Sequence, residues 1–108
     1  MLLERHEAIE VEDNYGWTPL FYAAYKGHGE ILTALLAAGA EVNVRTKTGV
    51  TPLMAASHEG HEQVVSTLLK HGADVRVRTE TGLTALSEAE SQGHKSVIRL
   101  LREAGAKE

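Results

Sequence analysis

The stretch GVTPLMAASHEGH, residues 49–61, decides the fold because the chain contains three versions of it. An earlier version reads GWTPLFYAAYKGH at residues 16–28, and a later one reads GLTALSEAESQGH at residues 82–94. Their first residues, Gly16, Gly49 and Gly82, are 33 positions apart. A fixed period of this length indicates an array of small structural units.

Nine of the ten glycines follow this interval, and each set has its own physical role. A Thr-Pro pair at 18–19 and 51–52 combines a capping hydroxyl with a proline suited to a first helical turn, so a helix is expected to start there. Thr84 keeps the hydroxyl without the proline. One glycine set should then break the helical stretch in two, and another should end it. The breaking set is Gly27, Gly60 and Gly93, and the ending set is Gly39, Gly72 and Gly105.

Each unit is therefore predicted to hold a short helix, a turn and a second, longer helix. The segments that join the units, residues 41–45 and 74–78, alternate apolar and polar side chains before the next glycine. A period of two is typical of a short extended arm, and the glycine favours a tight turn. We expect a projecting hairpin loop between successive helix pairs.

The pattern Gly-x-Thr-Pro-Leu-x-x-Ala, then Gly-His, then Leu-Leu-x-x-Gly-Ala, resembles the ankyrin repeat. The resemblance covers residues 13–108 and implies an all-α fold, an ankyrin-repeat α-solenoid of helix-turn-helix repeats with short β-hairpin loops. It divides the chain into an N-terminal partial repeat at 1–12, repeats at 13–45 and 46–78, and a C-terminal cap repeat at 79–108. It also implies that the concave face, the hairpin tips and the first helices bind a partner protein.

The two ends support these divisions. Leu2 and Leu3 match Leu35 and Leu36, so the chain is expected to begin inside a helix of a partial repeat. An excised or engineered chain and a short natural gene would both account for such a start. At the other end, charged residues replace the ones an inner repeat would pack against a neighbour, which predicts a polar outer face. These residues are Glu88, Glu90 and Arg102.

Composition excludes several classes of protein. Hydrophobic residues make up 43% of the chain and charged residues 24%, which is unlike a disordered chain, and no apolar run is long enough to span a membrane. With no cysteine there is no disulfide or thiolate metal site, and the first residues do not form a signal peptide, so an intracellular, cytoplasmic setting is expected. A net charge of −4 disfavours nucleic acid and anionic lipid as partners.

No catalytic, metal or cofactor site is predicted, and no small-molecule substrate. Three of the six histidines, His28, His61 and His94, share one repeat position and are expected to serve packing. His58 and His71 are expected to face solvent, with partner contact as the alternative for His58. No arrangement typical of nucleophilic catalysis or of phosphate binding is present in the sequence.

Charge is unevenly distributed along the repeats. The first thirteen residues are acidic, whereas the joining arms are basic. A solvated surface accounts for both, and the alternative is a basic ridge that steers an acidic partner or contacts phosphates. The bases of the arms are Arg45, Lys47, Arg76 and Arg78.

The aromatic residues give the strongest prediction of function, because all five lie between positions 15 and 25. In ankyrin repeats, the residues beside the hairpin glycine and just before the inter-helix glycine point to the binding face. Large aromatic side chains at such positions are typical of interface hot spots. The partner-binding residues predicted here are Tyr15, Trp17, Tyr25, Lys26, Phe21, Lys47, Val50, His58 and Leu83.

An alternative role for the aromatics is to fill the space under the partial repeat. We expect that role for Tyr22, and for Phe21 both roles remain open. The predicted function is a non-enzymatic protein–protein interaction module, monomeric or weakly self-associating through its exposed N-terminal end. The alternative is a structural spacer segment of a longer solenoid.

Overall fold

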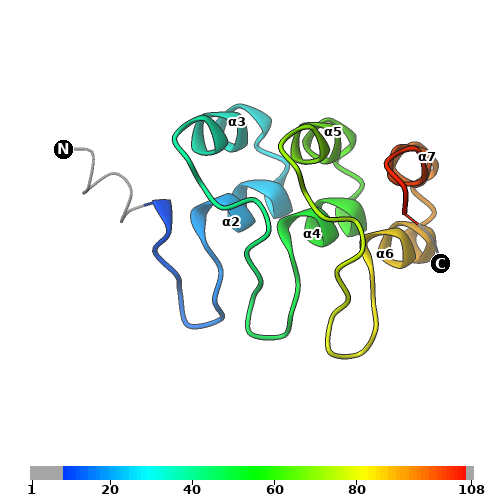
Figure 1. Ribbon diagram of the computed structural model, residues 1–108, viewed down its shortest axis with the longest axis horizontal. Coiled ribbons are helices and arrows are strands. Elements are labelled where there is room, and N and C mark those ends of the chain that lie inside the picture. The colour runs from blue at the N-terminus through cyan, green and yellow to red at the C-terminus, as the bar shows by residue number, and fades with distance from the viewer. Residues whose placement is uncertain (1–8, 107–108) are drawn as a thin grey trace.

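Three helix pairs make up the computed structural model, which describes residues 9–106 (Figure 1). The first pair is α2 (Pro19–Lys26) and α3 (Gly29–Ala37), and the second is α4 (Pro52–Glu59) and α5 (Glu62–Lys70). The third is α6 (Ala85–Gln92) and α7 (Lys95–Glu103). Each pair lies within one of the units expected from the sequence. The partial repeat predicted from Leu2 and Leu3 lies outside the described residues.

The first helix of each pair begins at the predicted threonine. The hydroxyl oxygen of Thr18 accepts a hydrogen bond from the backbone N–H of Phe21, and Thr51 does the same for Met54. Thr84 lacks a following proline, but it forms a reciprocal capping box with Ser87. Because capping bonds satisfy N–H groups that the helix leaves without partners, all three starts are fixed locally.

The turn between the helices requires glycine for two reasons. Gly27 and Gly60 are left-handed, with φ of 78° and 76°, which side chains rarely tolerate. A Cβ atom added at Gly60 would also lie 2.6 Å from the ring of His94, and one at Gly27 would lie 2.7 Å from the ring of His61. The backbone of one repeat thus makes room for the histidine of the next.

These histidines fasten successive repeats together. The Nε2 atom of His61 lies 2.9 Å from the carbonyl oxygen of Tyr25, and Nε2 of His94 lies 2.9 Å from that of His58. A carbonyl can only accept, so each ring donates its N–H. The packing role predicted for His61 and His94 is confirmed, whereas His28 is exposed.

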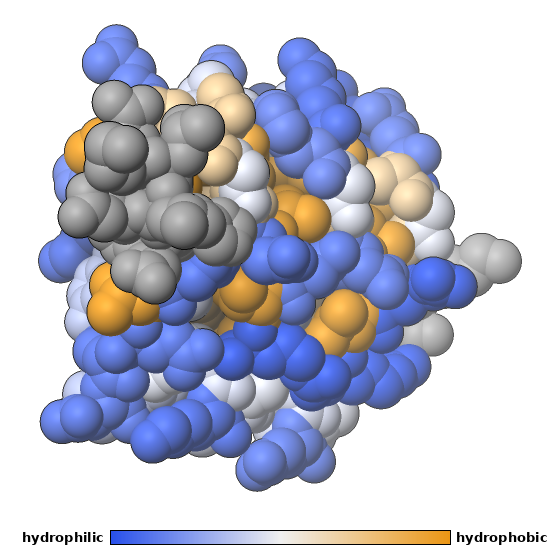
Figure 2. Space-filling view, turned by 60° about the vertical axis from the view of Figure 1, so that its left-hand side comes forward, coloured by the Kyte–Doolittle hydropathy of each residue, from blue (hydrophilic) through white to orange (hydrophobic). Residues whose placement is uncertain are grey.

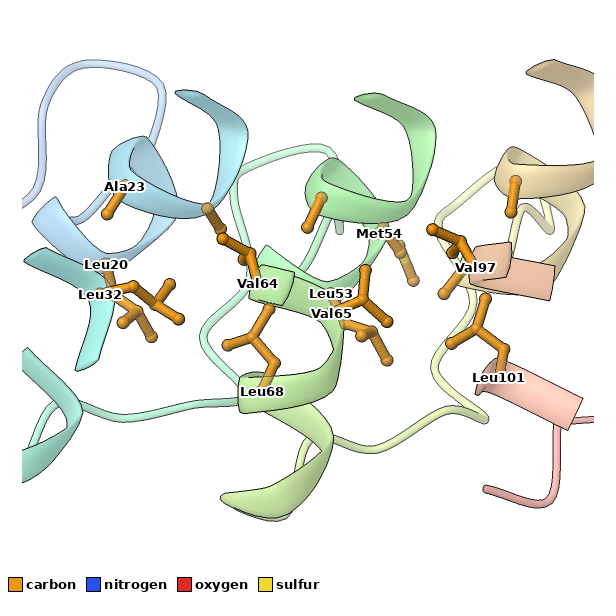
Figure 3. Close-up of a cluster of buried hydrophobic side chains, with 14 of the residues drawn as sticks. Leu20, Ala23, Leu32, Leu53, Met54, Val64, Val65, Leu68, Val97 and Leu101 are labelled. Atoms are coloured by element: carbon orange, nitrogen blue, oxygen red, sulfur yellow. The ribbon is translucent and has the colours of Figure 1, made fainter. Parts of the chain in front are cut away.

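The helices form two rows. In Figure 1, α2, α4 and α6 lie side by side in one row, and α3, α5 and α7 lie in the other. Buried leucines and valines run between the rows through all three pairs (Figure 3), including Leu32, Leu53, Val65 and Leu101. A repeat cannot bury its apolar face alone, so this continuous core makes the fold depend on the contacts between neighbours.

The loops that project from the rows contain turns. No β-strand is present in residues 9–106, so the expected β-hairpins are represented there by tight turns, each closed by two backbone hydrogen bonds. In the middle loop, the N–H of Thr46 donates to the carbonyl of Val50, and the N–H of Gly49 donates to the carbonyl of Thr46. Neighbouring loops are also joined, because the N–H of Lys47 donates to the carbonyl of Tyr15 at 3.1 Å.

The last repeat has the predicted polar end face, and two of the three charged residues expected there lie on it. Glu90 and Arg102 form an ion pair at 3.0 Å, and both side chains are partly exposed. Glu90 aligns with Ser57, which an adjacent repeat buries completely. The third residue, Glu88, does not lie on this face, as described below.

Candidate functional site

Each projecting loop holds one side chain of the apolar column formed by Trp17, Val50 and Leu83. The residue four positions earlier fixes the backbone of the column residue with two hydrogen bonds, one accepted by its own side chain and one donated by its own backbone N–H. In the first loop the carboxylate of Asp13 accepts from the N–H of Trp17 at 2.9 Å, while the N–H of Asp13 donates to the carbonyl of Trp17. Thr46 and Thr79 hold Val50 and Leu83 in the same way through their hydroxyl oxygens. The column is therefore preformed by local geometry.

Four of the five aromatic residues form one cluster centred on Trp17. Its ring centroid lies 4.6 Å from that of Phe21, 4.8 Å from that of Tyr22 and 5.5 Å from that of Tyr25. Tilted and edge-on contacts at such distances are favourable for aromatic pairs. These contacts leave the Trp17 side chain half-buried.

A groove of about 240 Å³ runs from this cluster across the second repeat to the third. We call it the aromatic groove. It lies beside the loops and the first helices, and it contains the column defined above. Figure 2 shows from the N-terminal side that hydrophobic side chains reach the surface in separate patches among hydrophilic ones. The groove is lined by Trp17, Phe21, Tyr25, Thr46, Thr48, Val50, Met54, Ala55, His58, Glu59, Thr79, Leu83 and Glu88.

A histidine and two glutamates form the polar part of the lining. The Nδ1 atom of His58 lies 2.6 Å from Oε1 of Glu88, and its Nε2 atom lies 3.8 Å from Oε2 of Glu59. The prediction that Glu88 belongs to the outer C-terminal face is wrong, because its carboxylate is directed to the preceding repeat. His58, expected to face solvent, does so only in part, because its side chain is 43% exposed and its ring is bonded to Glu88.

The prediction that Tyr22 packs inside is also wrong. Tyr22 is 42% exposed, and its hydroxyl donates a hydrogen bond to Oδ2 of Asp13. This bond lowers the pKa of the Asp13 carboxyl, and the N–H groups of Trp17 and Tyr15 lower it further. The same bond raises the pKa of the Tyr22 phenol. Phe21, for which both roles were open, is only 3% exposed yet lines the aromatic groove.

The structure brings most of the predicted partner-binding residues together. Tyr15 and Lys47 lie in an adjoining hollow with Trp17 and Tyr22, and the Nζ atom of Lys26 lies 5.7 Å from the ring centroid of Tyr25. Those that line the aromatic groove itself are Trp17, Phe21, Tyr25, Val50, His58 and Leu83.

Sequence reasoning missed most of the remaining lining residues. Thr46 and Thr79 carry a usable signal, because they occupy the same loop position as Asp13 and precede the column residues by four. Met54 could have been found from its alignment with Phe21. The other missed residues are Ala55 and Glu88, whereas Thr48 and Glu59 occupy repeat positions that the ankyrin resemblance assigns to the binding face.

The basic side chains of the arms form hydrogen bonds and ion pairs with other loop residues. A guanidinium nitrogen of Arg45 donates to the carbonyl oxygen of Arg78 at 2.8 Å, and Arg76 pairs with Asp74 at 3.2 Å. Arg78 in turn reaches the carbonyl of Gly82. The arms therefore join neighbouring loops as well as carrying charge.

The groove is small for a cofactor. Its volume of about 240 Å³ lies below the ~300–1,000 Å³ typical of sites for small molecules. In residues 9–106, no group of three or more His, Cys, Asp or Glu side chains is placed to hold a metal ion. No helix in that part of the chain is long and apolar enough to cross a membrane.

Comparison with known proteins places this geometry in a family. One relative is the human oxysterol-binding protein-related protein 1, 58% identical over 33 residues, which are 31% of this chain and 4% of that protein. Another is the human ankyrin repeat and SAM domain-containing protein 3, 61% identical over 31 residues, or 29% of this chain and 5% of that protein. The mouse ankyrin repeat and SAM domain-containing protein 6 is 42% identical over 48 residues, or 44% of this chain and 5% of that protein.

The chain thus spans only about a twentieth of the length of these relatives, and the likeness is confined to segments of 31 to 48 residues. The family model for ankyrin repeats in three copies matches residues 1–46 and 35–108. Together with the three helix pairs and their glycine turns, this match shows that the chain belongs to the ankyrin repeat family.

Proposed function

We propose that the chain is a non-enzymatic protein-binding module of an ankyrin solenoid, with the aromatic groove as its contact surface. Ankyrin repeats are generally protein–protein interaction modules and are typically non-enzymatic. The observation that carries the proposal is the preformed groove across three repeats, with the single tryptophan of the chain in its first-repeat end. Trp17 and its aromatic neighbours are the anchors, and the loop tips at Tyr15 and Lys47 extend the contact.

Preorganisation favours binding here. The backbone of each column residue is already fixed by two hydrogen bonds, and the Trp17 side chain is held by three aromatic contacts. A partner that docks on these side chains does not have to order them, so less conformational entropy is lost on association. Trp and Tyr are also the residue types most enriched among hot spots.

A second candidate function is that of a spacer segment in a longer solenoid, and the N-terminal face of the first repeat favours it. Ile31 is 55% exposed, whereas Val64 and Val97 at the same repeat position are buried against the preceding helix pair. Tyr22 is likewise exposed where Ala55 is buried. An apolar face of this kind fits another helix pair or weak self-association.

Two variants separate these functions. Trp17→Ala removes the largest aromatic side chain that lines the aromatic groove, and Ile31→Ala removes an exposed apolar side chain from the N-terminal face. We expect Trp17→Ala to reduce capture of a partner from a cell lysate and to weaken its binding, once purified, by about 2 kcal/mol or more. Ile31→Ala should leave partner binding unchanged and reduce any concentration-dependent self-association in sedimentation.

Circular dichroism of Trp17→Ala provides the necessary control. Trp17 lies outside the central cluster of buried residues, so the helical signal should persist. If the variant unfolds, Trp17 is a structural residue and the more conservative Trp17→Phe takes its place in the binding assay. Unchanged partner binding by a folded Trp17 variant would contradict the proposed function.

A further inference from the structure

The charges that line the aromatic groove have one sign. Its lining includes two carboxylates, Glu59 and Glu88, and no lysine or arginine. His58 lies between them. Of their side chains, 35% of Glu59 and 18% of Glu88 remain exposed, so Glu88 is the more enclosed of the two. A partly desolvated negative charge is stabilised by a cation placed beside it.

The contacts of His58 do not use all the hydrogen-bond acceptor sites of these two carboxylates. A neutral imidazole has one N–H, and at Nδ1 that hydrogen satisfies only one lone pair of Glu88. The contact to Glu59, at 3.8 Å, is longer than a hydrogen bond. An ionised carboxylate has about four lone-pair sites, so both groups can accept further donors from a bound molecule.

The aromatic part of the groove suits the apolar alkyl stem of a cationic side chain. Long basic side chains lay their alkyl stems along apolar surface and keep the charged head at its polar edge. The faces of aromatic rings also attract cations directly. The chain itself provides an example, since Lys26 holds its ammonium 5.7 Å from the ring centroid of Tyr25.

The neighbouring basic side chains lie outside the lining, including Lys26, whose ammonium is placed over the ring of Tyr25. Lys47 borders the adjoining hollow rather than the aromatic groove, and Arg45 and Arg76 bond to Arg78 and Asp74 in the loops. An acidic partner side chain entering the groove would meet two carboxylates and no Lys or Arg among the lining residues. The charge pattern therefore selects against an acidic side chain at this point.

We infer that the aromatic groove recognises a lysine or arginine side chain of a partner peptide segment. The alkyl stem lies along Trp17 and Tyr25, the charged head is bound by Glu59 and Glu88, and apolar neighbours in the segment contact Val50 and Leu83. This inference rests on the proposed function and specifies its partner chemistry. The groove volume, too small for a typical small-molecule site, suits one long side chain and its immediate neighbours.

A library of random seven-residue peptides displayed on phage tests the inference. The library is selected against the wild-type chain and, in parallel, against Trp17→Ala. Sequences enriched only on the wild type should share a Lys or Arg flanked by apolar residues. In a synthetic winner, replacing that residue by norleucine, which keeps an alkyl chain without the charge, should weaken binding at least about tenfold.

Variants of the protein test which carboxylates bind the charged head of the basic side chain. Glu88→Gln keeps the shape and an acceptor for His58 but loses the charge, so it should remove most of the preference for lysine over norleucine. Glu59→Gln should reduce that preference as well. Glu62→Gln, which neutralises an exposed glutamate outside the lining, is the matched control and should bind both peptides as the wild type does.

The outcomes are distinguishable. Winners without a basic residue would overturn this inference while leaving the groove as a protein-binding site. Failure to enrich any peptide over the Trp17→Ala control would contradict both the inference and the proposed function. A strict need for lysine that persists in Glu59→Gln and Glu88→Gln would overturn the assignment of the charged head to these carboxylates.

Discussion

The ring of His94 donates a hydrogen bond to the carbonyl of His58 while it lies against Gly60, at a distance that leaves no room for a Cβ atom there. One side chain thus joins the third repeat to the second and dictates glycine at a position in its neighbour. Gly27 and His61 repeat the relationship one unit earlier. This contact explains why the glycine and the histidine recur with the same period.

Gly93 provides a control for this contact. It has nearly the same φ as Gly60, 74° against 76°, but a Cβ at Gly93 would meet nothing within 4 Å. Gly93→Ala should therefore lower the free energy of unfolding only through strain in the left-handed backbone, by about 1–2 kcal/mol. Gly60→Ala should cost a further ~1–3 kcal/mol from overpacking against His94. Urea denaturation of both variants measures the difference, and equal losses would contradict the steric role of His94.

The hydrogen bond itself can be tested at the ring. His94→Ala removes the donor to the carbonyl of His58, and we expect it to destabilise the array by about 1 kcal/mol or slightly more. His28→Ala is the matched variant, because His28 is exposed at the same repeat position. Thermal unfolding should show a lower midpoint for His94→Ala than for His28→Ala. The reverse order would argue against the fastening role.

Ser57 is a site of potential stabilisation. Its hydroxyl is fully buried and has no hydrogen-bond partner among the described residues, while the first repeat has Ala24 at this position, also fully buried. A buried hydroxyl without a partner costs roughly 1–3 kcal/mol. Ser57→Ala should therefore raise the unfolding free energy by about 1 kcal/mol, as measured by urea denaturation. A lower stability would show that the hydroxyl is satisfied in solution.

Tyr22 and Asp13 predict a dependence on pH. Their hydrogen bond raises the pKa of Tyr22 above the ordinary value of 10.0, so its stabilising effect is complete below that pH and is lost as pH rises through the higher folded value. The pKa of Asp13 is lowered from 3.8, so its contribution is present above that pH and is lost as pH falls through the lower folded value. Stability should therefore be lost at both extremes.

Ultraviolet absorbance of tyrosinate can observe the upper transition. Ionisation of Tyr22 should appear as a late step, above the ordinary tyrosine pKa of 10.0. Tyr22→Phe should remove the late step, and Asp13→Asn should move it toward the ordinary value. A late step that persists in Tyr22→Phe belongs to another tyrosine and would refute the assignment.

The sequence was sufficient for the repeats but not for the direction of every side chain. Threonine caps and glycine turns were predictable because each acts through its own backbone within a few residues. Glu88 and Tyr22 were not, because a repeat position does not reveal which neighbour a side chain faces. Glu88 turns toward His58 of the preceding repeat, and Tyr22 turns outward to Asp13. The floor of the groove at Phe21 likewise depends on how the repeats stack.

The fluorescence of Trp17 tests the central claim most directly, because Trp17 is the only tryptophan of the chain and lies in the aromatic groove. The measurement is acrylamide quenching of its emission, first in the free protein and then in the complex with a captured partner or a selected peptide. Occupation of the groove predicts a blue-shifted emission and markedly reduced quenching in the complex. A saturated complex in which both remain as in the free protein would contradict the account.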